Sequence, residues 1–495
     1  MTFRDIYLLS PELSVAGLGI LIILLDLFIR RTSVMASVSL LGLLFPLVLT
    51  LTLYGELDAN DTRQLSGTFG TFVVDGFGLF FKLLVMAVLA LIIMSSGDFV
   101  RKLGRFGAEY YAILLFSTSG MMLLVSATEL ISIYIALELT ALPIATLAAF
   151  GRDSRSSESG VKFLLLSAMS SAILLYGMVL VYGSVGSTQL TEIFQGIQSS
   201  IEPSIPFGGY GLFLGIIMMT AGFGFKIASV PFQMWVPDVY EGAPTPVTAY
   251  LSVASKAAGF AIILRVFYVA FGDLSVDWAG LFAGLAVASM TVGNLVAVAQ
   301  TNIKRMLAYS TIAHAGYIMV GIASVAASMP SGEVLVGPSG VLFYLVAYAA
   351  SNLAAFFVII VIASNTGSEL IRDMVGFARQ SPMLAGVLAF ALVSLTGLPP
   401  TVGFMGKMYL FSSALSSDLA WLAIMGVLNS VLSAYYYLRV IRVMYTDGNI
   451  ENRDFHVAPM PMIAIAVTSI GILALGIFPE PLFTATQSAV QVLLR

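Results

Sequence analysis

Residues 339–363 read SGVLFYLVAYAASNLAAFFVIIVIA and carry no charged side chain. A helix needs roughly 20 apolar residues to cross the hydrocarbon core of a bilayer, and this run is long enough. The rest of the chain has the same character, because 59% of its 495 residues are hydrophobic and only 10% are charged. Ordinary soluble domains carry about 25% charged residues. We therefore predict an all-α polytopic membrane protein.

Similar apolar windows follow one another along the chain and predict about 14 transmembrane helices. These windows are residues 8–29, 34–54, 74–95, 109–126, 129–149, 161–183, 210–231, 245–269, 278–299, 304–325, 339–363, 382–411, 420–445 and 460–481. Most of the 23 Lys and Arg residues fall in alternate loops. Since positively charged loops stay on the cytoplasmic side, this pattern predicts that both termini lie on the outer side.

Proline interrupts two of these windows. Pro231 ends the seventh window, and Pro399 and Pro400 lie inside the twelfth. Proline removes a helical hydrogen bond, and in lipid the freed carbonyl needs protein or water. Broken helices at matching positions are typical of transporters with inverted repeats. The pattern predicts two inverted five-helix repeats, spans four to eight and nine to thirteen, with helices 7 and 12 broken.

The predicted repeats divide the chain into four parts. An N-terminal three-helix segment covers residues 1–107, and a C-terminal helix 14 occupies residues 447–495. The two antiporter-like repeats lie between them, at residues 108–272 and 273–446.

The sequence contains no cysteine. Iron–sulfur clusters and most structural zinc sites use thiolate ligands, so neither is expected here. We predict that the chain carries no redox centre, no metal and no cofactor of its own. Its net charge of −4 gives no basic surface for nucleic acid.

Five basic residues lie within the predicted spans: Lys82, Lys226, Lys256, Arg265 and Lys407. Each costs about 2.5 to 3.5 kcal/mol at the bilayer centre on insertion scales. Lys82 and Arg265 are near enough to a span end to snorkel to the interface. This favours a structural role for Arg265, whereas a structural and a functional role stay equally open for Lys82. The other three belong to broken or central helices, where backbone polar groups can hold water.

Glu138 lies near the centre of the fifth span and can pair with Lys226. A carboxylate and an ammonium keep each other ionised at short range, while desolvation favours their neutral forms, so their protonation depends on their separation. This property suits a proton relay, and a static ion pair that fixes helix packing is the alternative. His314, in the middle of the tenth span beside Ser310 and Thr311, is a further candidate for the relay.

Three motifs in order resemble the antiporter-like subunits of respiratory complex I. They are KIASVPFQMWVPDVYEGAPTPVTAYLSVASK at 226–256, KRMLAYSTIAHAGY at 304–317 and GLPPTVGFMGK at 397–407. The resemblance covers essentially the whole chain. Within that family the chain is most similar to the subunit N branch, which includes the mitochondrial subunit two. The lysine at 407 and the short C-terminal extension favour this branch.

The resemblance implies a subunit of a proton-pumping NADH:quinone oxidoreductase, in which protons move along Glu138, Lys226, Lys256 and Lys407. The flavin, the iron–sulfur clusters and the quinone site belong to partner subunits. The implied partners are neighbouring antiporter-like and small membrane subunits, and the implied location is a bacterial inner membrane. Two alternatives stay open: a subunit of a multi-subunit cation/proton antiporter, and a structural membrane subunit whose buried charges only fix packing.

Overall fold

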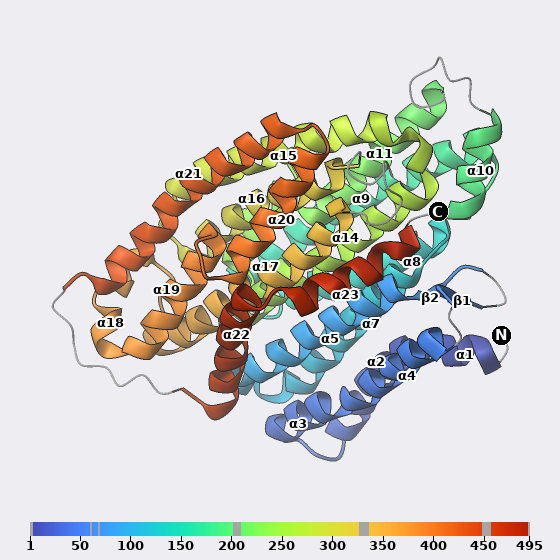
Figure 1. Cartoon of the computed structure of the whole chain (residues 1–495). Coiled ribbons are helices and arrows are strands. Elements are labelled where there is room, and N and C mark those ends of the chain that lie inside the picture. The colour runs from blue at the N-terminus through green and yellow to red at the C-terminus, as the bar shows by residue number, and fades with distance from the viewer. Residues whose placement is uncertain are drawn as a thin grey trace.

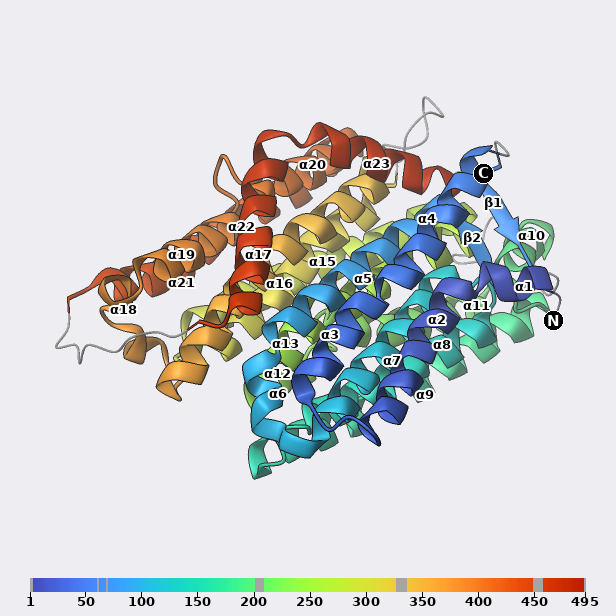
Figure 2. The same ribbon diagram turned by 90° about the horizontal axis from the view of Figure 1, so that it is seen from below.

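The computed structural model describes residues 3–59, 62–67, 70–200, 209–325, 336–447 and 457–493. It is a bundle of long helices (Figures 1 and 2). Within these ranges, twelve helices or runs of consecutive helical segments are long and apolar enough to cross a membrane. The predicted all-α polytopic fold is confirmed. The described strands are β1 (Gln64–Ser66) and β2 (Val73–Asp75), which pair antiparallel.

The N-terminal segment covers one side of the bundle (Figure 2). Its helices are α1 (Phe3–Leu8), α2 (Ser10–Asp26), α3 (Thr32–Gly42), α4 (Leu44–Ala59), α5 (Gly76–Ser95) and α6 (Gly97–Leu103). Helix α5 is the most deeply set of these and contacts α7, α13 and α14.

The next part of the chain contains the first broken span. Its helices are α7 (Gly107–Ser126), α8 (Leu130–Ala148), α9 (Ser154–Val185), α10 (Leu190–Ser200), α11 (Tyr210–Ile227), α12 (Trp235–Gly242), α13 (Thr245–Tyr250) and α14 (Lys256–Arg265). Two π-helical turns, Leu251–Ser255 and Val266–Ala270, flank α14 and make one continuous span with it and α13.

The remaining part contains the second broken span. Its helices are α15 (Ser275–Val298), α16 (Ile303–Ala323), α17 (Val336–Thr366), α18 (Phe377–Gln380), α19 (Pro382–Thr396), α20 (Val402–Ser416), α21 (Ala420–Tyr445), α22 (Pro459–Ile477) and α23 (Glu480–Val490). Helix α23 follows the predicted last span and packs on α17 and α5, so the chain ends against its own N-terminal segment (Figure 1).

Two predicted windows hold shorter helices than expected. Helix α2 has 17 residues. The window 382–411 is divided between α19 and α20, which have 15 residues each. The count of fourteen crossings and the inverted repeats therefore stay predictions.

Burial separates the inner helices from the outer ones. About 94% of the apolar stretch is buried in the α13–α14 span and in α16, and 89% in α17, against 28% in α22. A helix that is apolar all round and buried belongs to the interior, whereas one that exposes apolar side chains faces lipid or a neighbouring chain. The helices that carry Lys256 and His314 therefore form the centre of the bundle.

Candidate functional site

The first helix break exposes backbone groups that the surrounding protein satisfies. Helix α11 ends at Ile227, Ala228 takes the left-handed conformation with φ 63°, and Pro231 lies in the gap before α12. The carbonyl of Gly224 accepts from the amide of Ser229 at 2.8 Å. Lys226 lies in the last turn of α11 and is buried. Its ammonium is at the negative end of the helix dipole, which stabilises a cation.

The second break binds its lysine directly. Helix α19 ends at Thr396, and Pro399 and Pro400 lie in the gap before α20. Lys407 Nζ donates to the freed carbonyl of Thr396 at 2.8 Å and to Ser430 Oγ at 2.6 Å. It also lies 4.5 Å from the centre of the Tyr317 ring, a distance typical of a cation–π contact. The break thus provides the polar surroundings that a buried ammonium requires.

Lys256 is the first residue of α14, directly after the π-helical turn Leu251–Ser255. Its side chain is 2% exposed, and Nζ donates to the carbonyl of Thr311 on α16 at 2.9 Å. Thr311 precedes His314 by nearly one helical turn. Lys256 and His314 are therefore neighbours across the interface between α14 and α16.

His314 lies at the centre of a group of tyrosines. Its Nδ1 is 2.7 Å from the Tyr344 hydroxyl, and its Nε2 is 3.2 Å from the Tyr437 hydroxyl. Tyr437 also hydrogen-bonds Ser310. Lys256 and Lys407 both lie close enough to the imidazole to interact with it electrostatically. The structure thus brings Lys256, His314 and Lys407 together, and their role in a proton relay stays a prediction.

The tyrosines around His314 are the residues that sequence analysis missed. Tyr344 and Tyr348 are four residues apart on α17, and Tyr348 hydrogen-bonds Thr311 at 2.9 Å. Tyr344, Tyr348 and Tyr437 are all fully or almost fully buried. A buried tyrosine hydroxyl usually has a polar partner. Tyr344 and Tyr348 are four residues apart within an apolar span, which places them on one face of a helix. That spacing could have indicated them from the sequence.

Glu138 is less enclosed than predicted. It is half-buried on α8, where Ser171 of α9 donates to its Oε1. It interacts electrostatically with Lys226, but no ion pair joins the two within the described ranges. Its neighbours on the same helix, Ile135 and Leu142, are 60% and 53% exposed. The static Glu138–Lys226 ion pair is therefore absent from the described residues.

Lys82 and Arg265 do not snorkel to the interface, although both lie near a span end. Lys82 Nζ lies 2.6 Å from Glu12 Oε1, and Arg265 forms two hydrogen bonds with Asp75, at 2.7 and 2.9 Å. All four side chains are at most 3% exposed. A buried charge needs a partner of opposite sign, and here the partners come from helices or strands far away in the sequence.

A charged cluster and a polar cavity lie at one end of the bundle, in the loops that the sequence placed on the cytoplasmic side. Arg305 contacts Asp238 at 2.9 Å and Glu241 at 2.8 Å, and Lys162 contacts Asp238 at 3.0 Å. The adjoining cavity has a volume of about 630 Å³ and borders Lys304 and Glu369, which form an ion pair of 2.8 Å.

Asp238 makes this cluster sensitive to acid. Burial raises the pKa of its carboxyl, but hydrogen bonds from Lys162 and Arg305 outweigh burial and hold the pKa below its ordinary 3.8. Its stabilising effect is therefore present above pH 3.8 and lost as pH falls through the lowered pKa of the folded state.

We expect Asp238→Asn to flatten the fall in melting temperature as the pH drops below about 5, because the variant has no carboxylate to protonate. Thermal unfolding of the detergent-solubilised protein measures this. The control is Glu158→Gln, since Glu158 is 63% exposed and forms an ion pair with Lys162. An Asp238→Asn curve parallel to that of the parent protein would contradict the assignment.

Among the described residues, no group of three or more His, Asp or Glu side chains is arranged to hold a metal ion. The chemistry that the central residues can perform is proton transfer, since lysine, histidine and tyrosine side chains all exchange protons.

Comparison with known proteins identifies the family. Residues 127–433 match the family described as "NADH:quinone oxidoreductase/Mrp antiporter, TM". The chain belongs to this family. A member from Dehalococcoides mccartyi, named NADH-quinone oxidoreductase subunit N, is 43% identical over 99% of this chain and 100% of its own length. One of the same name from Moorella thermoacetica is 44% identical over 98% of each chain.

Solved structures agree with the family assignment. A chain of respiratory complex I from Thermus thermophilus is 30% identical, with a TM-score of 0.79 over 97% of this chain and 99% of that one. A chain of the Mrp complex from Dietzia sp. has a TM-score of 0.83 at 19% identity, which shows a shared fold. The segment that matches the NADH:quinone oxidoreductase/Mrp antiporter family contains Glu138, Lys226, Lys256, His314 and Lys407. Glu12 and Lys82 lie outside it.

Proposed function

We propose that this chain is the subunit N type of proton-translocating membrane subunit in NADH:quinone oxidoreductase. It acts as one subunit of a translocase in which other subunits hold the flavin and the iron–sulfur clusters and reduce the quinone. The observation that carries the proposal is the buried series Lys256, His314 and Lys407. Lys256 donates to the carbonyl of Thr311, and His314 lies between the hydroxyls of Tyr344 and Tyr437. Full-length relatives named as this subunit support it.

In this mechanism, Lys256 takes up a proton from the cytoplasmic side and passes it through water and His314 to Lys407. The buried tyrosines hold the imidazole between two hydroxyl groups, which orients both ring nitrogens. The proton leaves to the outer side when the charge state of Glu138 and Lys226 changes. That change comes from a neighbouring membrane subunit, which fits the half-buried position of Glu138.

The same proposal includes the two inverted repeats, spans four to eight and nine to thirteen, with both termini on the outer face of a bacterial inner membrane. The two breaks support this arrangement, because each lies beside a buried lysine, Lys226 in one and Lys407 in the other.

Replacing Lys226 by Ala is expected to lower proton pumping and coupled NADH oxidation together, by about tenfold, because it removes the partner through which Glu138 acts. The complex should still assemble, since Lys226 lies beside a helix end that other groups already satisfy. Pumping by inverted vesicles and NADH:quinone activity are measured in parallel. Full pumping by this variant would refute the proposed function.

A cation/proton antiporter is the second candidate, because the family includes Mrp antiporter subunits. It predicts sodium-dependent proton transport in membranes that do not oxidise NADH. The absence of such transport, with pumping driven by NADH, separates the two functions.

A further inference from the structure

The pair formed by Glu12 and Lys82 is buried, yet its polar atoms are only partly satisfied. Glu12 is 0% exposed in the first turn of α2, and Lys82 is 1% exposed on α5. Besides the ion pair of 2.6 Å, Ser126 Oγ donates to Glu12 Oε1 at 3.4 Å. Glu12 Oε2 has no hydrogen-bond partner among the described residues. An ammonium has three N–H donors, and leaving such groups unpaired in a dry interior is costly.

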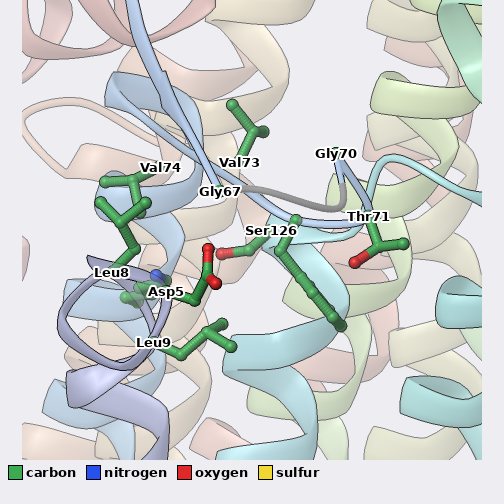
Figure 3. A pocket seen from close by; sticks show the side chains of 11 residues that line it. Asp5, Leu8, Leu9, Gly67, Gly70, Thr71, Val73, Val74 and Ser126 are labelled. Carbon is green, nitrogen blue, oxygen red and sulfur yellow. The ribbon is translucent and has the colours of Figure 1, made fainter. Parts of the chain in front are cut away.

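A cavity of about 80 Å³ lies directly beside this pair. Lys82 and Ser126 form part of its wall, together with Asp5, Thr71 and exposed Gly70. Figure 3 shows Asp5, Thr71 and Ser126 around this hollow. A buried water needs polar partners and roughly 10–15 Å³ of such space, so the cavity has room for several waters. Water in this cavity can form the hydrogen bonds that Glu12 Oε2 and the Lys82 ammonium do not form with the described protein groups.

The pair is also connected to the helix that carries Lys256. A Cβ added at Gly78 would lie 3.1 Å from Asp75 Oδ1 and 3.6 Å from both Arg265 Nη2 and Ser126 Oγ. Ser126 therefore lies between the Glu12–Lys82 pair and the Asp75–Arg265 pair. Arg265 is the last residue of α14, and Lys256 is the first. The two buried ion pairs therefore lie near each other at the end of that helix, with Ser126 close to both.

We propose that Glu12 and Lys82 form a further proton-exchange site, which water reaches from this cavity and which Ser126 couples to the Asp75–Arg265 pair at the end of α14. In the exchange, an N–H bond of the Lys82 ammonium breaks while an O–H bond forms on cavity water or on Glu12, and no electron is transferred. This inference rests on the proposed function. It adds the N-terminal segment to a path otherwise confined to the region of the family match.

Water access is tested first, by labelling introduced cysteines, because the chain has none of its own. Lys82→Cys in membrane vesicles is treated with a membrane-impermeant methanethiosulfonate, added to each side in turn. The matched control is Leu79→Cys, which lies one turn earlier on α5 and is 0% exposed. We expect labelling of Lys82→Cys from one side only and protection of Leu79→Cys. If Lys82→Cys does not assemble, Ser126→Cys replaces it. Protection of the cavity cysteine from both sides would overturn the inference.

Function is tested with the double variant Glu12→Gln/Lys82→Met, which removes both charges and leaves neither unpaired. The control double variant is Asp98→Asn/Arg101→Gln, a surface pair in which Arg101 is 71% exposed. We expect the first to lower the protons pumped per NADH oxidised about twofold in the assembled complex, and the second to leave this ratio unchanged.

A purely structural role for the pair predicts the opposite result. If Glu12 and Lys82 only fix α2 against α5, the neutral double variant assembles and pumps like the parent protein, and the inference falls. Lys226→Ala, measured in the same vesicles, separates the two proposals. Normal pumping by Glu12→Gln/Lys82→Met together with failure of Lys226→Ala overturns the inference and leaves the proposed function standing.

Discussion

Replacing Lys256 by Met is expected to reduce proton pumping at least about 100-fold, the largest effect in the chain. Met fills a similar volume but has no proton to donate, and the Thr311 carbonyl then loses its donor at 2.9 Å. No other lysine of α14 can replace it, since Lys256 is the only one in that helix. Acidification of inverted vesicles driven by NADH measures the effect.

The matched control for this prediction is Lys102→Met, which removes an exposed lysine at the end of α6. Its pumping should equal that of the parent protein. If Lys256→Met pumps at more than about half the parental rate in an assembled complex, Lys256 does not carry protons and the relay must be assigned to other residues.

Replacing Gly403 by Ala is expected to prevent stable folding of the second helix break. The added Cβ would overlap the backbone oxygen of Ser394. The amide of Gly403 already lies 3.3 Å from Ser394 Oγ. A backbone atom cannot move aside as a flexible side chain can, so the two halves of the break must separate. Overpacking of this kind costs about 3 kcal/mol. We expect a lower melting temperature and little assembled complex on a native gel.

Gly386→Ala on α19 is the control, because its Cβ would meet nothing within 4 Å. Alanine is also the better helix former, so this variant should be at least as stable as the parent protein. Equal stability of the Gly403→Ala and Gly386→Ala variants would show that the close approach of α19 and α20 is not required.

The sequence predicted the bundle because insertion into lipid depends on local composition. An uncharged run such as residues 339–363 has few alternatives to a buried helix, and α17 covers that window entirely. The two breaks were equally local signals, since Pro231 and the Pro399–Pro400 pair cannot continue a helix. In both places one helix ends before the proline and the next begins after it: α11 and α12 at the first break, α19 and α20 at the second.

The partners of the buried charges could not be predicted in this way. Glu12 and Lys82, or Asp75 and Arg265, meet only after distant segments pack together, and nothing in a local window marks Asp75 as the partner of Arg265. The tyrosines around His314 come from α17 and α21 for the same reason. Sequence reasoning located Lys256, His314 and Lys407, but their connections depend on tertiary structure.

The half-buried position of Glu138 has a consequence for how the chain can be studied. A carboxylate between exposed apolar side chains such as Ile135 and Leu142 sits at a lateral surface that a neighbouring subunit or lipid must cover. The dielectric around Glu138 therefore differs between the separated chain and the assembled complex. Protonation measured on the isolated subunit would describe a different chemical environment, so only the intact assembly can report how Glu138 and Lys226 respond to each other.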